Sequence, residues 1–543
     1  MFDYLTRQII ARLEQLKWPT HQLQLSRPKK VENGDWSSNI AMALARDLKR
    51  APMHIAAELM EGMQLDPGIV SKFEILNPGF INFFQTSNYL TSQVKNILKA
   101  DNRYGSSDFG SGKTAQVEFV SANPTGPLTV GHGRQTVLGD TLANILTWSG
   151  YDVTREYYFN NAGRQMRLLG ESLKARYFEL KGEVTLLPDG GYEGEYLIEI
   201  AKALLEDKPD LSGDTDINIF KEFAENSIFA IIKSSLERIG VKHDVFYNER
   251  SLYEDGKIDE VLELLGEKGL LYKKDGATWF KTSELGIEQD RVLVKSSGEP
   301  TYRLPDIAYH REKVARGFDL VVDIFGADHI DAYPDVLSAL KVMGLKHEHI
   351  QVVIHQFVTL MRSGEIVKMS TRKANFVTLD ELIDEVGADV VRYFYIMRSA
   401  SSHLNFDLDL AKRQTDENPV FYLQYAHARI SSIFRRAEER GLIADSDQAD
   451  LSLLNEEFTI ALINQALEFP EVLDHCRRSL EVHHLPSYLF SLATALHKFY
   501  TEYKVVDLEN PELSRARMAL LEAVQITLRN GLRILGISAP EQM

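Results

Sequence analysis

Residues 115–150 read AQVEFVSANPTGPLTVGHGRQTVLGDTLANILTWSG, and this stretch decides the fold. Its first eight residues include Val117, Phe119 and Val120, whose apolar side chains are typical of a buried strand. NPTGP follows as a turn. After the turn, apolar side chains recur at helical spacing, at Leu138, Leu142, Ile145 and Leu146. Strand, Gly/Pro turn and helix form the opening unit of a doubly wound parallel sheet.

Three further segments extend this pattern. YDVTREYYF (151–159), FDLVVDIFGADH (318–329) and HIQVVIHQFVTL (349–360) are each typical of a strand, and the second ends in a polar loop. Residues near 165–285 are mixed and helix-rich, as expected of an insertion. The sequence therefore predicts a Rossmann-type α/β domain over 111–410 that carries an inserted segment.

The flanks of this domain have a different character. Residues 1–110 begin with helical patterning and close with FEILNPGFINFF, which predicts strands around a Pro-Gly turn. A stretch rich in Gly, Ser and Asp (101–113) marks the boundary of this α+β domain. Residues 411–543 show helical periodicity and few strand signals. We therefore expect a separate all-α domain at the C-terminus.

Bulk properties narrow the class of protein. The chain has 543 residues, 44% hydrophobic and 26% charged, which is ordinary for a soluble multidomain protein. The longest apolar runs are too short to span a membrane, and the N-terminus lacks the pattern of a secretory signal. The single cysteine, Cys476, excludes an internal disulfide and a cysteine-held zinc site. We expect a cytoplasmic protein without a bound structural metal.

The net charge of −17 argues mildly against a nucleic-acid partner, because phosphate favours a basic surface. Net charge does not report patches, however. Local basic clusters occur at Arg27, Lys29 and Lys30, and at Arg372 and Lys373. An acidic chain that binds RNA would concentrate such groups on one face.

The turn before the predicted helix can bind phosphate. A helix N-terminus presents free backbone N–H groups and a partial positive charge. Gly131 and Gly133 would let a nucleotide approach the backbone. His132 could donate a hydrogen bond to ATP oxygens as negative charge builds. Taken alone, a glycine-rich turn with an exposed histidine explains the same residues.

A second segment, MRSGEIVKMSTRKANFVTLDEL (361–382), contains Lys368, Met369 and Ser370. A lysine and a hydroxyl on a Gly/Ser-rich loop suit a mobile clamp on the pyrophosphate of ATP. The plainer alternative is a solvated basic loop. Both segments follow predicted strands of one sheet, and ligands of doubly wound folds bind outside the carboxyl ends of the strands.

These two segments resemble the HIGH and KMSK signatures of class I aminoacyl-tRNA synthetases. The surrounding sequence resembles the arginyl-tRNA synthetase family: EFVSANPTGPL, YYFNNAGRQM, TYRLPDIAYH, FGADH, GADVVRYFYIMRSASSHLNFDLDLA, QYAHARI and LGISAPEQM. The resemblance covers essentially the whole chain. It implies a catalytic domain at 111–410 between a tRNA-elbow-binding domain at 1–110 and an anticodon-binding domain at 411–543.

The resemblance also implies the site residues for ATP. Catalytic roles fall on His132, Lys368 and Ser370. The ATP-binding set is Thr129, Gly131, His132, Gly133, Gly326, Asp328, Lys368, Met369 and Arg372. Gly326 and Asp328 follow a predicted strand, where a simple loop role is the alternative. His355 lies within another predicted strand, and we expect it to be structural.

Two positions depart from the family pattern. The leading histidine of the first signature is Thr129, which can hydrogen-bond but cannot carry charge. The second lysine of the second signature is Thr371, and the turn upstream of the first offers Thr125 and Gly126 rather than a compensating lysine. Arg372 or Lys373 is left to supply the missing positive charge.

The resemblance assigns arginine binding to Glu118, Asn123, Tyr302 and Asp306. A guanidinium needs a carboxylate for bidentate pairing. Glu118 lies in an apolar strand, so an unpaired carboxylate would be costly there and a partner is expected. The alternatives are a solvent-facing Glu118, a turn role for Asn123 before a proline, and a helix-start role for Asp306.

For tRNA, the resemblance implies two surfaces. Asn77, Phe80 and Asn82 correspond to contacts with the tRNA elbow, although a turn and core packing explain them equally. The anticodon set is Tyr422, Tyr425, Arg429 and Met543. The first three are spaced i, i+3, i+7 and share one helix face, where aromatic rings can stack on bases and arginine can pair with phosphate. Core packing is the alternative for the tyrosines.

The activity implied is activation of L-arginine with ATP and Mg²⁺, followed by transfer to tRNA(Arg) with release of AMP and pyrophosphate. We expect adenylate formation to require bound tRNA, no membrane partner and a monomer. Two rivals remain: another class I synthetase, such as a glutamyl or cysteinyl enzyme, and a non-catalytic paralogue that binds tRNA or a partner. The lone cysteine disfavours a cysteinyl enzyme, which uses a zinc site. The departures at Thr129 and Thr371 leave the non-catalytic paralogue as an alternative.

Overall fold

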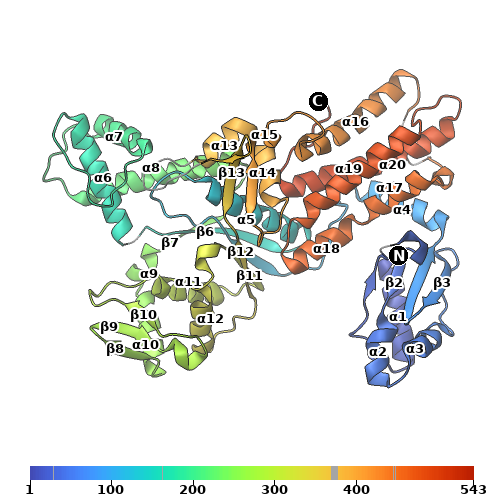
Figure 1. Ribbon diagram of the computed structural model, residues 1–543, viewed down its shortest axis with the longest axis horizontal. Helices are drawn as coiled ribbons and strands as arrows, with labels where there is room; N and C mark the ends of the chain where they lie inside the picture. The colour runs from blue at the N-terminus through green and yellow to red at the C-terminus, as the bar shows by residue number, and fades with distance from the viewer. Residues whose placement is uncertain (29, 162, 368–376, 444, 447) are drawn as a thin grey trace. The chain divides into compact units, whose positions relative to one another are not determined.

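The computed structural model describes residues 1–543 with the exception of 29, 162, 368–376, 444 and 447 (Figure 1). The second signature, with Lys368, Met369, Ser370, Thr371, Arg372 and Lys373, therefore lies outside the described residues. The chain forms two compact units. Unit 1 comprises residues 1–104, 429–468 and 494–527, and unit 2 comprises residues 105–428, 469–493 and 528–543.

Unit 2 is built on a five-stranded sheet whose strands are all parallel, in the order β12-β11-β5-β6-β7. The chain leaves β5 in one direction towards β6 and β7, and later returns to the other side of β5 with β11 and β12. This is the doubly wound order that the sequence predicts. The strands are β5 (Thr114–Glu118), β6 (Asp152–Phe159), β7 (Val245–Asn248), β11 (Leu320–Gly326) and β12 (Ile350–His355).

The opening strand is shorter than expected. A strand over 115–122 is predicted, but β5 ends at Glu118. Val120 and Ser121 take left-handed backbone conformations, with φ of 71° and 40°, which turn the chain away from the sheet. Helix α5 (Val130–Trp148) then begins where predicted and packs on β5, β6 and β11. Gly139 allows the close approach, because a Cβ there would lie 2.1 Å from the ring of Phe119.

The predicted insertion over 165–285 contains one strand of the sheet itself. β7 lies inside this range and pairs with β6, so the extra structure is divided into two groups. The first group is α6 (Arg164–Leu180), α7 (Glu195–Asp207) and α8 (Ile217–Arg238), in which α6 packs against both other helices (Figure 1). The second lies between β7 and β11: α9 (Arg250–Glu254), α10 (Lys257–Glu267), α11 (Arg303–Ala315) and the antiparallel sheet of β8 (Leu271–Lys274), β9 (Ala277–Phe280) and β10 (Arg291–Val294).

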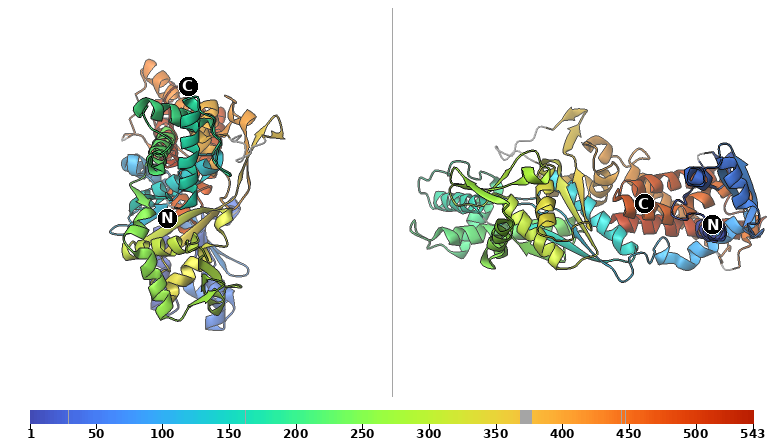
Figure 2. Two further views of the ribbon diagram at one scale, coloured as in Figure 1. Left: turned by 90° about the vertical axis from the view of Figure 1, so that its left-hand side faces the viewer. Right: turned by 90° about the horizontal axis from the view of Figure 1, so that it is seen from below.

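The predicted strand over 349–360 is two strands. β12 ends at His355, and the buried Arg134 of α5 donates to the carbonyl of Gln356, where the chain leaves the sheet. β13 (Val358–Arg362) forms a separate sheet with β14 (Glu365–Ile366) and β15 (Leu404–Asp407). The hairpin of β13 and β14 projects from the rest of unit 2 (Figure 2). The remaining helices here are α12 (Tyr333–Val342), α13 (Leu379–Val386), α14 (Ala388–Ile396) and α15 (Leu408–Ala411).

The C-terminal segment is helical throughout its described residues, as expected. Its helices contribute to both units, and those in unit 2 connect to the sheet through Arg392 of α14. This buried guanidinium donates to the carbonyls of Ile239 and Leu535 and to Asp140 of α5. The helices are α16 (Pro419–Glu439), α17 (Glu457–Leu467), α18 (Phe469–Ser479), α19 (His484–Glu502) and α20 (Pro511–Leu535).

The N-terminal part of unit 1 is the expected α+β fold. Its four-stranded sheet is antiparallel in the order β1-β2-β4-β3, and α1, α2 and α3 pack on it around a core that includes Leu5, Ile40 and Phe83. The elements are α1 (Phe2–Gln15), β1 (Leu25–Ser26), β2 (Trp36–Ser38), α2 (Ile40–Leu48), α3 (Pro52–Met60), β3 (Val70–Leu76), β4 (Phe80–Gln85) and α4 (Ser87–Ala100). Across the described residues, no helix combines the length and apolarity needed to cross a bilayer.

Candidate functional site

The point where the strand order reverses lies between β5 and β11, and the first signature follows it directly. In doubly wound sheets this crevice outside the carboxyl ends of the strands is the ligand site. The N-terminus of α5 lies here. β11 ends at Gly326 at the same edge, and Asp328 follows it. The charge of Asp328 acts on both His132 and His355, so these three residues are neighbours. The fold thus brings together the residues expected to bind ATP from two distant segments.

His132 is held as a neutral donor. The backbone N–H of Thr129 donates to its Nδ1 at 3.1 Å, which leaves the proton of the neutral ring on Nε2. Burial lowers the pKa of His132 to about 4, although Asp328 acts in the opposite direction. The ring therefore stays uncharged at neutral pH, with an N–H available to a ligand. Thr129, in place of the leading histidine, is the N-cap of α5.

The segment after the second signature is hydrogen-bonded to the segment before α5. Leu379 donates its backbone N–H to the carbonyl of Leu128 at 2.8 Å, and Val130 donates to the carbonyl of Val377 at 3.3 Å. Thr129 and Thr378 form the bridge between them. The chain therefore emerges from residues 368–376 directly beside the first signature, as the sequence predicts for two segments that share one ligand.

The glycines of the site have different roles. A Cβ on Gly131 would meet one atom within 4 Å, the hydroxyl of Thr129 at 3.7 Å, so Gly131 faces open space. A Cβ on Gly133 would lie 2.8 Å from Leu379 and 2.9 Å from the ring of Tyr395. Gly133 is required by helix packing, whereas only Gly131 leaves room for a ligand.

His355 has an unused nitrogen at this site. It ends β12, and its Nδ1 lies 3.2 Å from the carbonyl of Gln356, which fixes Nδ1 as the protonated nitrogen. Its buried Nε2 has no hydrogen-bond partner among the described residues and lies 3.9 Å from the Cβ position of Gly326. A buried acceptor without a partner is costly, so a ligand group that donates to it would be favoured. Sequence patterns indicated a structural role and missed this.

Three carboxylates form an acidic row across the middle of the sheet, on the face that α11 covers. Glu118 of β5 is in register with Glu156 of β6 on one side and with Asp323 of β11 on the other. All three side chains are buried. Like charges in adjacent register positions repel each other, so this row needs cations to be stable.

Helix α11 supplies those cations. The Lys313 ammonium, 0% exposed, donates to Glu118 and, at 2.5 Å, to Asp323. Burial opposes the charge on Lys313, but the two carboxylates outweigh it and raise its pKa. Arg316 pairs with Glu156 through both of its terminal nitrogens. The partner expected for Glu118 is therefore Lys313. Its other oxygen accepts from Ser121 at 2.8 Å, so both oxygens already have donors within the chain.

A second group, the acidic pocket formed by Asp306 and Glu249, is not compensated in this way. No described residue donates a hydrogen bond to the Asp306 carboxylate. Its removal from solvent, with Glu249 and Glu118 nearby, raises its pKa to about 7, although His310 and Lys313 act in the opposite direction. Glu249 is buried and accepts from the hydroxyls of Tyr158 at 2.9 Å and Tyr253 at 3.4 Å. Burial also raises the pKa of Glu249. Among the described residues, no cation hydrogen-bonds to the carboxylate of Asp306 or Glu249, and the pocket fits a ligand cation.

The other two residues expected to bind arginine have no side-chain hydrogen bond to Asp306 or Glu249 in the described structure. Tyr302 is the N-cap residue of α11, and its carbonyl accepts from the backbone N–H of Asp306 at 3.3 Å. Its ring is half exposed, with Arg303 over it. Asn123 is exposed, and its amide donates to Gln165 of α6 at 2.8 Å.

The residues expected at the tRNA elbow divide into surface and interior. Asn77 and Phe80 are exposed at the turn between β3 and β4, beside Phe73 and Leu76, which are also exposed. Asn82 is 2% exposed, and its Oδ1 accepts from Ser37 at 2.6 Å. Asn82 therefore supports this surface from within the sheet.

The residues expected at the anticodon lie on α16 and at the chain end. Tyr422 and Tyr425 are half-buried, against Phe490 and Phe421 respectively. Arg429 follows one turn further along α16, with its guanidinium over the ring of Tyr500. Met543 is exposed.

Sequence reasoning missed Glu249 and Lys313 as site residues. Both lie in stretches whose charged residues look like ordinary solvated surface, FYNERSLYE and YHREKVARG. Their positions beside the sheet depend on the pairing of β7 with β6 and on the packing of α11 over the sheet. The signal available for Glu249 was its position two residues after the short apolar run VFY (245–247).

Three family models match the chain. They are an arginyl tRNA synthetase N-terminal domain at residues 3–85, a class I (R) tRNA synthetase catalytic domain at residues 93–393, and a DALR anticodon binding domain at residues 423–543. Together they span most of the sequence, and the catalytic-domain match alone covers more than half of it.

Similar proteins match over the full length. The chain is 49% identical to an arginine–tRNA ligase of Salinibacter ruber over 100% of both chains, and 52% identical to one of Chlorobium limicola over 96% of both. The crystal structure of a putative arginyl-tRNA synthetase from Campylobacter jejuni aligns with a TM-score of 0.77 at 32% identity, covering 84% of this chain and 100% of that one. The chain therefore belongs to the arginine–tRNA ligase family of class I aminoacyl-tRNA synthetases.

Proposed function

We propose that this enzyme activates L-arginine with ATP to give arginyl-adenylate and pyrophosphate, and then transfers arginine to the 3′ end of tRNA(Arg) with release of AMP. In the first step, an arginine carboxylate oxygen attacks the α-phosphorus of ATP in line with the departing pyrophosphate. In the second, a hydroxyl of the terminal ribose takes the arginyl group. Catalysis of this kind rests on positioning and on stabilising charge rather than on a covalent enzyme intermediate.

The observation that carries the choice of amino acid is the uncompensated acidic pocket. Five carboxylates, namely the acidic row and the acidic pocket, face two permanent cations, Lys313 and Arg316. A guanidinium in contact with Asp306 and Glu249 restores the balance and can pair with a carboxylate through two N–H groups. We assign Glu118 a supporting role: it fixes Lys313 and adds to the negative potential, while Asp306 makes the direct contact. Asn123 and Tyr302 line the approach.

The nucleotide site is assigned to the N-terminus of α5 and the end of β11. Gly131 leaves room for phosphate at the start of α5, and His132 donates from Nε2 to phosphate oxygens. Thr129 supports the site through its backbone N–H, which donates to His132, and Gly133 through the packing of α5. Gly326 leaves space for the nucleotide at the end of β11. Mg²⁺ enters with ATP, and the exposed carboxylate of Asp328 is the hard oxygen ligand that suits it.

The second signature completes the site by clamping the pyrophosphate with Lys368, Met369 and Ser370. The proposal is supported by the hydrogen bonds of Val377 and Leu379, which hold the segment after the second signature beside the first signature. Arg372 takes over the charge of the lysine that Thr371 replaces, because a guanidinium also pairs well with phosphate.

The tRNA contacts are assigned to two surfaces. Asn77 and Phe80 meet the elbow, with Asn82 supporting them. Tyr422, Tyr425, Arg429 and Met543 meet the anticodon loop, where rings stack on splayed bases. The enzyme is a cytoplasmic monomer, with a central domain at 111–410 between domains at 1–110 and 411–543.

The test is ATP–pyrophosphate exchange with each of the twenty amino acids, with and without total tRNA. Exchange with arginine alone, and only when tRNA is present, is expected. Exchange with another amino acid would contradict the role of the acidic pocket. A folded protein without exchange under any condition would point to a non-catalytic paralogue.

His132→Ala is the matched test of the nucleotide site. Removing one donor aimed at the developing phosphate charge lowers kcat by about 10²–10³-fold. His347→Ala, at a half-exposed histidine before β12, is the control and leaves kcat unchanged. Equal activity of the two variants would remove His132 from the mechanism.

A further inference from the structure

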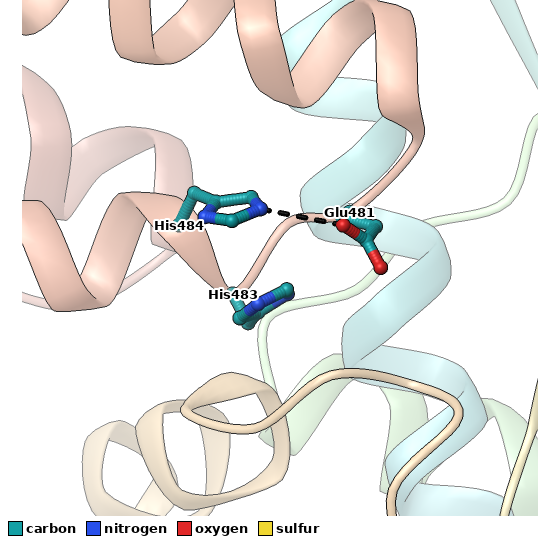
Figure 3. Close-up of side chains that lie close together, drawn as sticks. All are labelled: Glu481, His483 and His484. Carbon is teal, nitrogen blue, oxygen red and sulfur yellow. Dashed lines mark hydrogen bonds and ion pairs between the residues drawn. The ribbon is translucent and has the colours of Figure 1, made fainter.

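A group of histidines lies outside the site described above, at the connection between α18 and α19 in unit 2. Glu481, His483 and His484 each offer one ligating atom, and these atoms lie within 4.8 Å of one another (Figure 3). Glu481 is exposed and both histidines are half-buried, so the group is open to solvent ions. We propose that Glu481, His483 and His484 bind one Zn²⁺ ion, which fastens the turn between α18 and α19.

The distances suit this ion. Tetrahedral Zn²⁺ with bonds of about 2.0–2.1 Å holds its ligands about 3.3 Å apart. His484 Nε2 already lies 3.3 Å from Glu481 Oε2. Side-chain rotation alone can bring the His483 ring to the same separation, because Figure 3 shows it directed towards the Glu481 carboxylate. Two imidazoles and one carboxylate, with a water as the fourth ligand, form a ligand set that selects zinc over Mg²⁺ or Ca²⁺.

A second observation points to a missing ligand. The Nδ1 atom of His483 is buried and, among the described residues, has no hydrogen-bond partner. An unsatisfied polar atom of this kind destabilises the fold by itself. Coordination of the ring by a cation would draw it into a defined position and offset that cost.

The turn that carries the ligands is held firmly. Val482 and Leu485 flank the two histidines in sequence and are both buried, and the N–H of Leu485 donates to the carbonyl of Val482 at 3.1 Å. Pro486 accepts a hydrogen bond from the Tyr393 hydroxyl, which attaches the turn to α14. The ligands are therefore arranged before an ion arrives, which limits the conformational entropy lost on binding.

His475 of α18 braces the site. Its ring meets that of His484 edge to face, with centroids 4.5 Å apart, and the His483 ring also contacts His484, with centroids 4.1 Å apart. The His484 ring thus packs against two others. This proposal revises the expectation that the chain binds no metal of its own, which rested on cysteine and did not consider neighbouring histidines from two helices.

The experiment is calorimetric titration of ZnCl2 into the full-length, chelator-stripped enzyme, with excess Mg²⁺ present to occupy carboxylate sites. The test variant is His483→Ala/His484→Ala. The matched control is His347→Ala/His349→Ala, which removes two half-exposed histidines beside Glu348 whose ligating atoms do not converge with it. Wild type and control are expected to bind one Zn²⁺. The test variant is expected to bind it at least tenfold more weakly, a loss of the size seen when even outer ligand contacts are removed (about 10–100-fold).

Two further measurements distinguish the loss of a zinc ligand from a change in the structure of the turn. Glu481→Gln keeps both rings and the turn, and is expected to weaken Zn²⁺ binding by about tenfold. Added Zn²⁺ should raise the Tm of wild type and control but not of the double test variant, because an ion that binds the folded state stabilises it. Equal Zn²⁺ affinity in the two double variants, or no Zn²⁺ uptake by wild type, would overturn the proposal.

Discussion

The acidic row is covered by α11, and the acidic pocket includes Asp306 of the same helix, yet their carboxylates have different partners. In the row, Glu118 and Asp323 share Lys313, and Glu156 has Arg316. In the pocket, Asp306 has no hydrogen-bond donor among the described residues and Glu249 has two neutral tyrosine hydroxyls. Neighbouring carboxylates thus have hydrogen-bonded cations in the row and, among the described residues, none in the pocket.

This difference separates structure from binding. A compensated buried charge holds elements together, and removing its partner damages the fold. A buried charge without a partner lowers the stability of the free enzyme, and a bound cation removes that cost. Removing such a charge therefore weakens binding of the cation. The sequence predicts arginine binding by both Glu118 and Asp306, and their different surroundings lead us to propose different roles for them. Four substitutions or conditions test this distinction.

Lys313→Met should produce the largest effect, on stability. It leaves Glu118 and Asp323 buried side by side without a cation, which costs roughly 3–5 kcal/mol in the free energy of unfolding. Urea unfolding of the variant measures this loss. The control is Lys202→Met, whose exposed partner Glu199 is one turn away, and its effect is expected within about 0.5 kcal/mol. A loss below about 1 kcal/mol for Lys313→Met would show that the row does not depend on this cation.

Asp306→Asn should show the opposite pattern. Loss of the carboxylate that meets the guanidinium weakens L-arginine binding at least 100-fold, as for the loss of one member of a buried charge pair. The free energy of unfolding at pH 8 should not fall, because the substitution removes a buried acid without a donor. Calorimetry with L-arginine and urea unfolding give the two values. Unchanged arginine affinity would place the substrate elsewhere.

Much of the fold follows from local sequence. The parallel sheet, α5 and the helical C-terminus are set by apolar periodicity and by turns such as NPTGP, which act over a few residues. The errors occur where distant contacts decide. β12 ends at His355, and the next carbonyl, that of Gln356, accepts a hydrogen bond from Arg134 instead of from a neighbouring strand. β7 belongs to the sheet only through its pairing with β6. Neither contact leaves a pattern in the local sequence.

The site was predictable in outline and not in its charges. The spacing of the signatures, with the rule for doubly wound sheets, indicated one nucleotide site. The bonds of Leu128 and Val130 to residues 377–379 place the segment that follows the second signature beside the first, while the second signature itself lies outside the described residues. The sequence could not distinguish Glu118 from Asp306. The difference is that Lys313, almost two hundred residues beyond Glu118, donates a hydrogen bond to Glu118 and not to Asp306.

Glu249→Gln sharpens the comparison within the pocket. The amide oxygen can still accept from Tyr158 and Tyr253, so the structure of the pocket is kept while its charge is reduced. Arginine binding is expected to weaken about tenfold, the effect of making one charged hydrogen bond neutral. The control is Glu199→Gln, because Glu199 forms an exposed ion pair. Glu225 is less suitable, since its ion pair with Arg250 is more buried. Equal affinity in the two variants would confine arginine recognition to Asp306.

The pH dependence of arginine binding tests the pocket without a substitution. Asp306 has a pKa raised from 3.8 to about 7 in the free enzyme, and a bound guanidinium would lower it. Arginine therefore binds the ionised form, and its affinity must fall as the pH falls through about 7. The ionised fraction drops from about 0.9 at pH 8 to about 0.1 at pH 6, so the affinity falls about tenfold. His132, whose pKa lies at about 4, stays neutral across this window and does not contribute. Asp306→Asn should flatten the profile measured by calorimetry. A profile that keeps its slope in that variant would assign the titration to another group, with Glu249 the first to examine because burial raises its pKa as well.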